Sequence, residues 1–464
     1  MKKQLLYLSL AMLPATLFAN EFNSPGDGST WNLEKLAAID TVGVTLESAG
    51  VYVMAENVNI AAADKFVLES GVTLKMGNGV QFYSDGMVDM NCSTMTTITR
   101  NADTDEPKGF YIATEEPTGK MTVKNVNFEY AGLRTWFVGE MDVENCSFSN
   151  NNGKNSSSAA LVFGPSGGKY NVTGCEFTSN TVPAIGCGGN VQIGLTIDGC
   201  TFNDNNTQNN NKPQINITAG GDNDIIIRNC TLKGGKRTMV GAISVANMMA
   251  LEGTNNVLIE NCDIRDHRYG ITHTHGPMNI TIKNNTIIDN KYETNAMNGG
   301  SGISLYDPYG YQNTYIEGNT IQGNLWGITI IGGANVNLGK TYDPTAADYN
   351  PGNNTFKDNG NNGVLYDLYN NGKSTVWAQG NTWNVDEQTN EKIETVIFHK
   401  ADDETLGEVI YQEGADGVEG INADAIGQNA PVEYYNIQGI KVNNPTKGIY
   451  IKVQGNKATK VNLK

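Results

Sequence analysis

Three of the four histidines in this 464-residue chain fall within one short segment, DHRYGITHTHG, at positions 266–276. Imidazole titrates near neutral pH and serves as a general acid, a general base or a metal ligand. A carboxylate beside an imidazole orients the ring and raises its basicity. We therefore predict His275 and Arg268 as catalytic candidates, with Asp307 as the carboxylate partner of His275.

Aromatic side chains crowd the same stretch of the chain. Exposed rings make flat apolar platforms for the faces of sugar rings, so we predict a substrate-binding patch. Its members are Tyr269, Tyr306, Tyr309, Tyr311, Tyr315 and Trp326. The loop at 291–300 is longer than its counterparts, and insertions in a repeat protein usually build the binding face. The alternative is that some of these tyrosines only stack between structural layers.

A six-residue phrase that recurs down the chain indicates how these residues are positioned. It has an apolar residue, a polar residue, an Asn/Gly corner and a second apolar residue. Its copies are VKNVNF (123–128), VENCSF (143–148), VTGCEF (172–177), IDGCTF (197–202), IRNCTL (227–232), IENCDI (259–264), IKNNTI (282–287), IEGNTI (316–321), PGNNTF (351–356) and AQGNTW (378–383). Such self-similarity indicates a solenoid, and the alternation predicts strands interrupted by a turn.

A second phrase follows each copy and predicts another half-buried strand, because its second and fourth positions are mostly apolar. It occurs as ALVFG (160–164), AIGCG (184–188), QINIT (214–218), AISVA (242–246), GITHT (270–274), GISLY (302–306), GITII (327–331) and GVLYD (363–367). Repeats with at least two short strands, stacked at the sheet spacing of roughly 4.8 Å, make a parallel β-helix.

The paired phrases resemble the right-handed parallel β-helix repeats of the pectate lyase-like superfamily, and the resemblance covers roughly residues 66–395. It implies an all-β fold, a right-handed parallel β-helix (solenoid), to which this chain adds a small C-terminal β domain. That fold hosts lyases, hydrolases, adhesins and tailspikes, so it does not define an activity.

The catalytic residues of that superfamily are not carried over to this chain. A uronate lyase needs a base and a group that neutralises the carboxylate, whereas a β-helix hydrolase needs two convergent carboxylates. Neither set lies on one outward column of the sequence. Whether the protein is an enzyme stays open, and an enzyme would be a polysaccharide lyase or a glycoside hydrolase. Calcium is expected only with an anionic substrate.

The repeat register places each histidine. His267 falls in a turn column otherwise held by asparagine, and His273 falls in the inward strand column, where we expect a hydrogen-bonded core residue. His275 lies just past the strand, between Asn247 and Asp307 of the neighbouring coils. Because His267 and His275 lie at opposite ends of a strand, we predict no metal site here.

Seven cysteines in an exported chain would normally suggest disulfides, but five of them share one position of the first phrase. They are Cys146, Cys175, Cys200, Cys230 and Cys262, and the same position holds Asn285, Asn319, Asn354 and Asn381 in later copies. We predict a ladder of small, reduced side chains that point into the coil. A set of disulfides is the alternative.

The two ends of the chain differ from the repeats in composition. Two lysines and then an apolar run that ends near Ala19 predict a signal peptide, and no later stretch predicts a transmembrane segment. The predicted parts are 1–19, the signal peptide; 20–65, an N-terminal cap and first strands; 66–398, the β-helix; 399–430, an acidic linker; and 431–464, a C-terminal β domain. Within the cap, a helix is expected in 27–39 with Ser29 or Thr30 as its N-cap.

The C-terminal domain resembles the sorting domain of the type IX secretion pathway of Bacteroidetes, through YNIQG at 435–439 and PTKGIY at 445–450. The resemblance implies the export machinery as a partner and a location that is secreted or on the exterior of the outer membrane. The formal charge of −17 disfavours nucleic acid and polyanionic glycans as ligands, unless a local basic groove or bound Ca²⁺ reverses the sign of the surface charge.

Two functional hypotheses follow. The first is an exported or cell-surface β-helix protein that binds, and in one version also cleaves, a polysaccharide through its tyrosine-rich face. The second is a non-catalytic surface or adhesion protein that uses the β-helix as a rigid scaffold.

Overall fold

The computed structural model of the protein describes residues 21–115, 119–293, 295, 297–413, 432–436, 440–454 and 457–463. The chain divides into two compact units, which meet in sequence at Tyr411 and Gln412. The predicted signal peptide and residues 414–430 of the predicted acidic linker lie outside the described residues.

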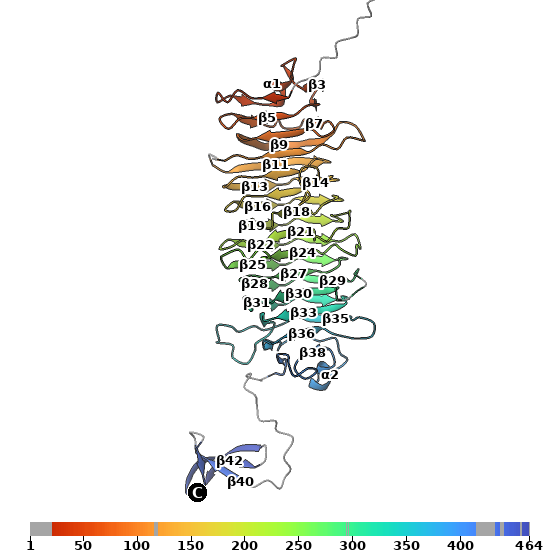
Figure 1. Ribbon diagram of the computed structural model, residues 1–464. Coiled ribbons are helices and arrows are strands. Elements are labelled where there is room, and N and C mark those ends of the chain that lie inside the picture. The colour runs from red at the N-terminus through yellow and green to blue at the C-terminus, as the bar shows by residue number, and fades with distance from the viewer. Residues whose placement is uncertain are drawn as a thin grey trace, which may run out of the picture. The chain divides into compact units, whose positions relative to one another are not determined.

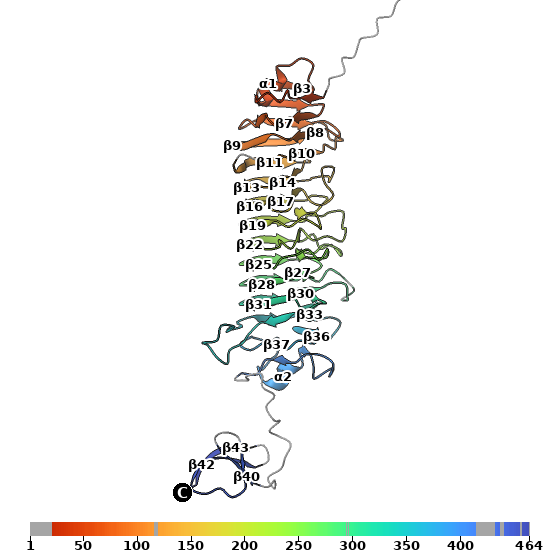
Figure 2. The same cartoon turned by 60° about the vertical axis from the view of Figure 1, so that its left-hand side comes forward.

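The first unit is a right-handed parallel β-helix, as predicted from the repeats (Figure 1; Figure 2). Its strands form three long sheets that run along the helix axis, so that a typical coil contributes one strand to each sheet. All the strand pairs in these sheets are parallel except the pair β3–β4.

Sheet 1 contains, in spatial order, β1 (Phe22–Asn23), β5 (Val58–Ile60), β8 (Gln81–Ser84), β10 (Gly109–Ile112), β12 (Leu133–Thr135), β15 (Leu161–Phe163), β18 (Ile185–Cys187), β21 (Ile215–Thr218), β24 (Ile243–Ala246), β27 (Ile271–Thr274), β30 (Ser301–Asp307), β33 (Trp326–Gly332), β36 (Leu368–Gly372) and β38 (Ile397–Phe398). Most of these strands correspond to the second repeated phrase.

Sheet 2 contains β2 (Thr30–Trp31), β6 (Lys65–Val67), the first part of β9 (Met87–Arg100), the first part of β11 (Met121–Glu129), β13 (Glu140–Glu144), β16 (Lys169–Thr173), β19 (Gly194–Asp198), β22 (Asp224–Arg228), β25 (Asn255–Glu260), β28 (Met278–Lys283), β31 (Gln312–Glu317), β34 (Asn335–Asn337), β37 (Val376–Trp377) and β39 (Val409–Ile410). Sheet 3 contains β3 (Val44–Ser48), β4 (Val51–Met54), β7 (Thr73–Met76), the later parts of β9 and β11, β14 (Ser147–Ser149), β17 (Glu176–Thr178), β20 (Thr201–Asn203), β23 (Thr231–Lys233), β26 (Asp263–Arg265), β29 (Thr286–Ile288), β32 (Thr320–Gln322) and β35 (Thr355–Lys357).

The first repeated phrase is the corner between sheets 2 and 3. In the copy at 143–148, β13 ends at Glu144, the backbone turns at Asn145 with φ of 49°, and β14 begins at Ser147. Gly199 and Asn229 hold the same place in later coils with φ of 63° and 55°. Only Gly, and to a lesser extent Asn, adopts this left-handed region at low cost. The Asn/Gly preference of the phrase is therefore a backbone requirement.

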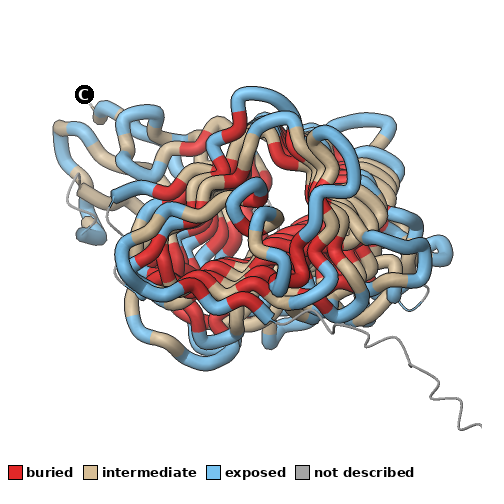
Figure 3. The backbone as a smooth tube through the Cα atoms, turned by 90° about the horizontal axis from the view of Figure 1, so that it is seen from above, coloured by how far each residue is buried: buried red, intermediate tan, exposed pale blue. Residues whose placement is uncertain are grey.

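The core consists of columns of equivalent residues on successive coils. The rings of Phe128, Phe148, Phe177 and Phe202 stack with centroids 4.8, 4.9 and 4.9 Å apart. These separations match the strand spacing of a sheet. Seen along the axis, the buried residues form continuous stripes that line the inside of the coil (Figure 3).

The predicted cysteine ladder is confirmed. All seven cysteines are buried and free. The N–H of Cys146 donates to Sγ of Cys175 at 3.4 Å, and the N–H of Cys262 donates to Oδ1 of Asn285 at 2.9 Å. The side chain of Asn285 then donates to Oδ1 of Asn319 at 3.0 Å, which extends the same column with amides. Thiols and amides thus satisfy successive backbone N–H groups at one corner.

The N-terminal helix is shorter than expected, and its predicted cap is wrong. Helix α1 spans Leu33–Ala37, and its N-cap is Asn32, whose side chain accepts a hydrogen bond from the N–H of Lys35 at 2.8 Å. Ser29 and Thr30 do not cap the helix, because Thr30 belongs to β2 and pairs with Lys65 of β6. Leu33 and Leu36 are buried and cover the end of the core.

The other end of the first unit lies beyond the boundary predicted at residue 398. Helix α2 spans Asn390–Glu394, and β39 follows and pairs with Val376 and Trp377 of β37. Val409 and Ile410 are buried, so they add a last layer to the core. The acidic residues on either side concealed this short strand in the sequence.

The second unit is a small antiparallel sheet, which agrees with the predicted C-terminal β domain. Its strands are β40 (Val432–Tyr435), β41 (Lys441–Val442), β42 (Gly448–Gln454) and β43 (Lys457–Leu463), in the order β41-β40-β42-β43. Across the described residues of both units, no helix is long and apolar enough to cross a membrane.

Candidate functional site

The outward face of sheet 1 carries a column of small polar side chains near its C-terminal end. Register pairs Ser244 of β24 with Thr272 of β27, then Ser304 of β30, Thr329 of β33 and Tyr369 of β36. Successive side chains of a strand point to opposite faces. The apolar partners in the same strands, such as Ile303 and Ile328, therefore fill the core, while the hydroxyls form a flat outer floor.

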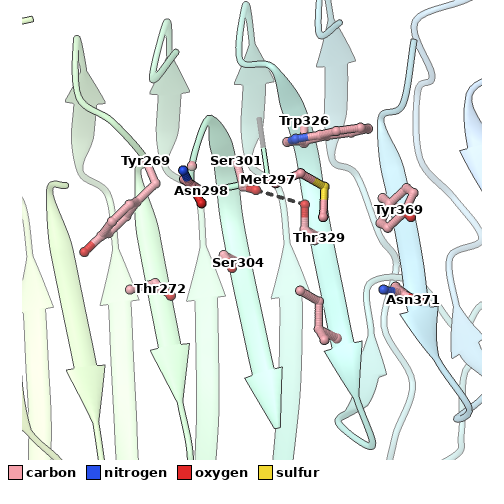
Figure 4. A pocket seen from close by; sticks show the side chains of 12 residues that line it. Tyr269, Thr272, Met297, Asn298, Ser301, Ser304, Trp326, Thr329, Tyr369 and Asn371 are labelled. Atoms are coloured by element: carbon pink, nitrogen blue, oxygen red, sulfur yellow. Dashed lines mark hydrogen bonds between the residues drawn. The ribbon is translucent and has the colours of Figure 1, made fainter. Parts of the chain in front are cut away.

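A pocket of about 240 Å³ lies on this floor. It is lined by Tyr269, Thr272, Met297, Asn298, Gly299, Ser301, Ser304, Trp326, Thr329, Ile331, Tyr369 and Asn371. Figure 4 shows Tyr269 on one side and Trp326 and Tyr369 on the other, with the hydroxyl side chains between them. From β27 to β36 there are three strand steps, so the floor between these walls is about 14 Å long.

The wall around Trp326 is a packed aromatic cluster. Trp326 stacks on Tyr366 with ring centroids 5.7 Å apart and an interplanar angle of 10°, and it also contacts Tyr369 at 5.2 Å. Tyr369 stacks in turn on Phe398 of β38 at 4.6 Å. Because each ring is supported by the next coil, the wall presents its faces without having to be ordered by a ligand.

The opposite wall depends on a glycine. Tyr269 lies against Gly241, where an added Cβ atom would be only 2.1 Å from Cζ of the ring. Burial raises the pKa of Tyr269 to about 12, so the phenol stays neutral and can donate or accept a hydrogen bond.

The predicted binding loop at 291–300 contributes to the pocket, and Arg268 holds it. Nε of Arg268 donates to the carbonyl oxygen of Asn298 at 2.9 Å, and Nη1 donates to Oδ1 of Asn211 at 2.5 Å. Glu293 pairs with the same guanidinium at 4.0 Å. Arg268, predicted as a catalytic residue, is thus placed so that it positions Met297 and Asn298 at the edge of the pocket.

The chemistry that the pocket offers is recognition by stacking and hydrogen bonding. The lining residues that the structure describes include hydroxyls, amides, apolar groups and aromatic rings, with no carboxylate, imidazole, amine or guanidinium among them. General acid–base catalysis needs at least one group that exchanges a proton near the working pH. Such a group would have to come from outside the lining of the pocket.

His275 lies at the end of β27, just outside the pocket, in a second aromatic group. Its backbone has φ of 58°, its N–H donates to the carbonyl oxygen of Tyr306 at 3.1 Å, and Nδ1 lies 2.7 Å from Oγ1 of Thr274. Its ring contacts Tyr306 edge-on at 5.1 Å and Tyr309 at 6.3 Å. Tyr306 pairs with Ile331, which lines the pocket, so the two areas adjoin.

Asp307 is positioned beside His275 in the register, as predicted, but its carboxylate has another role. It is fully buried, and Oδ1 accepts hydrogen bonds from the N–H groups of Tyr309 and Gly310 while Oδ2 accepts one from Gln312 at 2.7 Å. The carboxylate therefore organises the turn that displays Tyr309 and Tyr311.

The three predicted catalytic side chains are not assembled in the structure. His275, Asp307 and Arg268 all lie in the described part of the chain, and no hydrogen bond or ion pair joins any two of them. A catalytic role for His275, which we predicted together with Asp307, stays a prediction.

The six predicted binding aromatics separate into three groups. Tyr269 and Trp326 line the pocket. Tyr306, Tyr309 and Tyr311 form the adjoining group, in which Tyr309 stacks on Tyr311 at 5.7 Å. Tyr315 belongs to β31 of sheet 2, and its hydroxyl donates to Glu317 at 3.1 Å. Tyr315 is therefore on a different face from the other five.

The sequence reasoning missed Tyr369 and the row of hydroxyls. We expected a strand at 363–367, but β36 begins at Leu368, and its register partner for Ile330 is Asn370 and not Tyr366. The prediction for this coil was wrong because the long loop before it changes the repeat length. The alternation Leu368, Asn370 and Gly372 inward, with Tyr369 and Asn371 outward, was the available signal.

The two remaining histidines of the segment are core residues. His267 occupies the asparagine column as predicted: Nδ1 lies 3.2 Å from Oδ1 of Asn290, and Nε2 lies 2.7 Å from Nε2 of Gln214. His273 lies between Val245 and Leu305. Contrary to our expectation, neither of its ring nitrogens has a hydrogen-bond partner in the described structure.

Burial lowers the pKa of both histidines to about 3, because the charged form would be desolvated. Both are neutral at ordinary pH. The described residues also contain no group of three or more His, Cys, Asp or Glu side chains that could hold a metal ion.

Comparisons with known proteins concern the fold. The sequence model of the family described as right handed beta helix region matches residues 166–341. Among solved structures, a double mutant of the periplasmic alginate epimerase AlgG aligns with a TM-score of 0.40 and 15% identity, covering 83% of this chain and 81% of that chain. Another crystal structure of the same epimerase gives 0.36 and 13%, with 83% and 80% covered. No curated protein sequence matches this chain.

Proposed function

We propose that this is an exported protein that binds a polysaccharide along the outward face of sheet 1, with the pocket between Tyr269 and Tyr369 as its centre. The observation that carries the proposal is the combination of a hydroxyl floor with aromatic walls at both ends. A sugar ring has apolar C–H faces and a polar rim. Aromatic rings match the faces, and serine, threonine and asparagine side chains match the rim by donating and accepting hydrogen bonds.

The exposure of the adjoining tyrosines supports binding over a purely structural role. Tyr306, Tyr309 and Tyr311 are 39%, 64% and 55% exposed. Tyrosines that served only to stack successive coils would be covered by those coils, as Tyr170 is in the core. Binding energy from an exposed ring becomes available only when a ligand covers it, which is the use that we propose for Tyr309 and Tyr311.

Cleavage of the bound polysaccharide is the second candidate activity, and His275 is the observation that favours it. This imidazole is half-buried and lies against Tyr306 and Tyr309 on the same face as the pocket. A base at this place could remove a proton from a sugar that extends beyond Ile331. The neutral lining of the pocket gives such a reaction no second catalytic group, so binding is the primary proposal.

The proposed location rests on the two ends of the chain. The N-terminal apolar run is typical of a signal peptide, and the basic C-terminal β domain resembles a type IX sorting domain. We propose that the first directs export and that the second engages the secretion machinery, so that the β-helix acts outside the cell.

Binding can be tested with a panel of soluble polysaccharides, by calorimetry on the purified protein and its Trp326→Ala variant. A matched control is Tyr342→Ala, because Tyr342 stacks on Trp377 of sheet 2 at 5.7 Å and is 42% exposed. We expect the first variant to lose affinity and the control to keep it. New reducing or unsaturated ends would identify cleavage. Equal affinity of both variants and the native protein for every glycan would refute the proposed site.

A further inference from the structure

A second group of aromatic residues lies on the same outward face, near the N-terminal end of sheet 1. Register aligns Tyr83 of β8, Tyr111 of β10 and Arg134 of β12 in one outward row. The guanidinium carbon of Arg134 lies 4.5 Å from the centre of the Tyr111 ring and 5.9 Å from that of Trp136. The group therefore combines aromatic platforms with a positive charge, which the pocket lacks.

Among the described residues, Arg134 is the one arginine without a carboxylate partner. Of the six arginines, five form ion pairs: Arg100 with Asp103, Arg228 with Asp198, Arg237 with Asp204, Arg265 with Asp263, and Arg268 with Glu293. Within the described residues, Arg134 has no ion pair, and its Nε is buried without a hydrogen-bond partner. In a chain with a formal charge of −17, an arginine without an acidic partner is unexpected.

Nε of Arg134 is itself covered, so the terminal Nη groups are the donors that a ligand from outside the chain would reach. Leaving a buried polar atom of a charged group without a partner costs free energy. Stacking on Tyr111 offsets part of this cost and fixes the plane of the guanidinium. The planar fork then presents donors in the geometry that a carboxylate or a sulfate group accepts.

The rings beside Arg134 are seated firmly enough to serve as platforms. Trp136 lies over Gly164, where an added Cβ atom would be 2.7 Å from Cε3 of the indole, yet the residue remains 39% exposed. The hydroxyl of Tyr83 donates to Asp85 at 2.6 Å, which holds its ring against Tyr111 at 5.3 Å.

One outward row of sheet 1 connects Arg134 to the pocket, although Val162 and Ser244 on this row are buried. The outward row continues from Arg134 through Val162, Gly186, Asn216 and Ser244 to Thr272 in the pocket. These are five strand steps, or about 24 Å. A glycan that engages both places must therefore be longer than this distance.

We infer that Arg134, with Tyr111 and Trp136, is a subsite for an anionic substituent of the bound glycan, a carboxylate or a sulfate ester. The inference rests on the proposed function and adds the class of ligand, an acidic polysaccharide. Tyr111 and Trp136 pack against the sugar, and the Arg134 guanidinium donates to its charged group. Recognition of this kind weakens as salt screens the exposed part of the charge.

Three polymers with one backbone test the subsite: dextran, carboxymethyl dextran and dextran sulfate of equal length. We expect the native protein to bind at least one charged polymer more tightly than dextran. Arg134→Gln should weaken that binding about tenfold, the usual size of a lost charged hydrogen bond, and leave dextran unaffected. The affinity of Arg134→Lys for the charged polymer should fall between those of the native protein and Arg134→Gln, since lysine keeps the charge but lacks the planar guanidinium. The preferred polymer identifies the anionic group.

Arg228→Gln is the matched control, because Arg228 lies on sheet 2 and pairs with Asp198. Equal affinity of the native protein for the three polymers, or equal losses in Arg134→Gln and Arg228→Gln, would overturn the inference. Should Arg134→Gln fail to fold, Trp136→Ala serves as the second variant, and it should likewise weaken binding of the charged polymer. The inference and the proposed function fail separately: loss of binding in Trp326→Ala but not in Arg134→Gln refutes only the subsite, and the reverse result refutes only the pocket.

Discussion

The two aromatic regions of sheet 1 differ in charge although they lie on the same outward face. The pocket end, around Tyr269, Trp326 and Tyr369, presents neutral hydroxyls and rings. The other end presents Arg134 between Tyr111 and Trp136. Both are built on and beside the outward positions of strands in sheet 1. The solenoid thus fixes the direction of each side chain, whereas the residue type at an outward position can vary from coil to coil.

The two regions also differ in the core beneath them. The inward column that holds His273 at the pocket end holds Thr135 at the Arg134 end. The Thr135 hydroxyl donates to the carbonyl oxygen of Val162 at 3.2 Å, whereas His273 has no partner within the described structure. The buried hydroxyl of Thr135 therefore has its hydrogen bond, whereas the buried imidazole of His273 must stay neutral.

The largest expected difference between the two regions is in their stability at low pH. The pKa of His267 and His273 is about 3 in the folded state because burial disfavours the charged ring, against an ordinary value of 6.5. Below pH 6.5 the unfolded chain binds protons that the folded chain does not, so stability falls as the pH falls toward 3 and is unaffected above 6.5. Each histidine contributes about 1.4 kcal/mol per pH unit in that window.

Hydrogen exchange at pH 7, 5 and 4 would locate this loss. We expect β24–β30 to lose protection first, while β8–β12 remain protected. His273→Leu, which replaces the unpaired ring with an apolar side chain found elsewhere in the column, should reduce the effect. Uniform loss of protection along the first unit would contradict the account of the two cores.

The next largest effect is on neutral glycan binding. Removing the Trp326 or Tyr369 ring by substitution with alanine should cost about 1–3 kcal/mol of binding free energy, as stacked rings contribute elsewhere. Trp136→Ala should cost less with an uncharged glycan, since the Arg134 region has no anionic group to hold. Calorimetry on the three variants gives the comparison. A greater loss in Trp136→Ala would show that the regions have the opposite roles.

Much of the fold could be predicted because the repeat encodes it. The corner asparagines and glycines, the cysteine ladder and the position of His267 all follow from one column of the repeat. The hydrogen-bond partners of Asp307 could not be predicted, because the register shows that Asp307 lies near His275 but does not show where its carboxylate points. Three backbone N–H groups of the 307–312 turn bind Asp307 more closely than the imidazole does.

Only part of the candidate site could be predicted from the sequence, because the repeat register fails where a coil contains an insertion. Tyr269 and Trp326 were identified from their crowding, whereas Tyr369 was missed because an insertion shifted the strand to Leu368–Gly372. Arg134 had no distinguishing sequence motif. Its significance lies in a missing partner, which only the packing of coils reveals.

A smaller effect is expected in the tyrosine group between the pocket and His275. Replacing Tyr309 and Tyr311 together by alanine should remove about 1 kcal/mol or more of affinity with little change in thermal stability, because both rings are exposed. His275→Ala should then separate the functional classes. An enzyme would lose turnover at nearly unchanged binding, and a binding protein would change little in either measurement.

The smallest effect is expected from the C-terminal domain. Deleting 432–464 should leave the thermal unfolding of the first unit unchanged, since the two units are compact on their own. Both ends of sheet 1 should keep their ligands. In a host with the type IX pathway, the truncated protein should stay in the periplasm. Normal surface display would show that the tail is not a sorting domain.

The central claim is that a polysaccharide covers the pocket on sheet 1, and hydroxyl-radical footprinting with and without the bound glycan tests it most directly. Met297, at the rim, is 88% exposed, and Met95, on β9, is a matched methionine that is 49% exposed. The account predicts that the glycan protects Met297 and Trp326 and leaves Met95 and Tyr342 as reactive as before. Protection of Tyr342 without Met297, or no protection under saturating glycan, would contradict it.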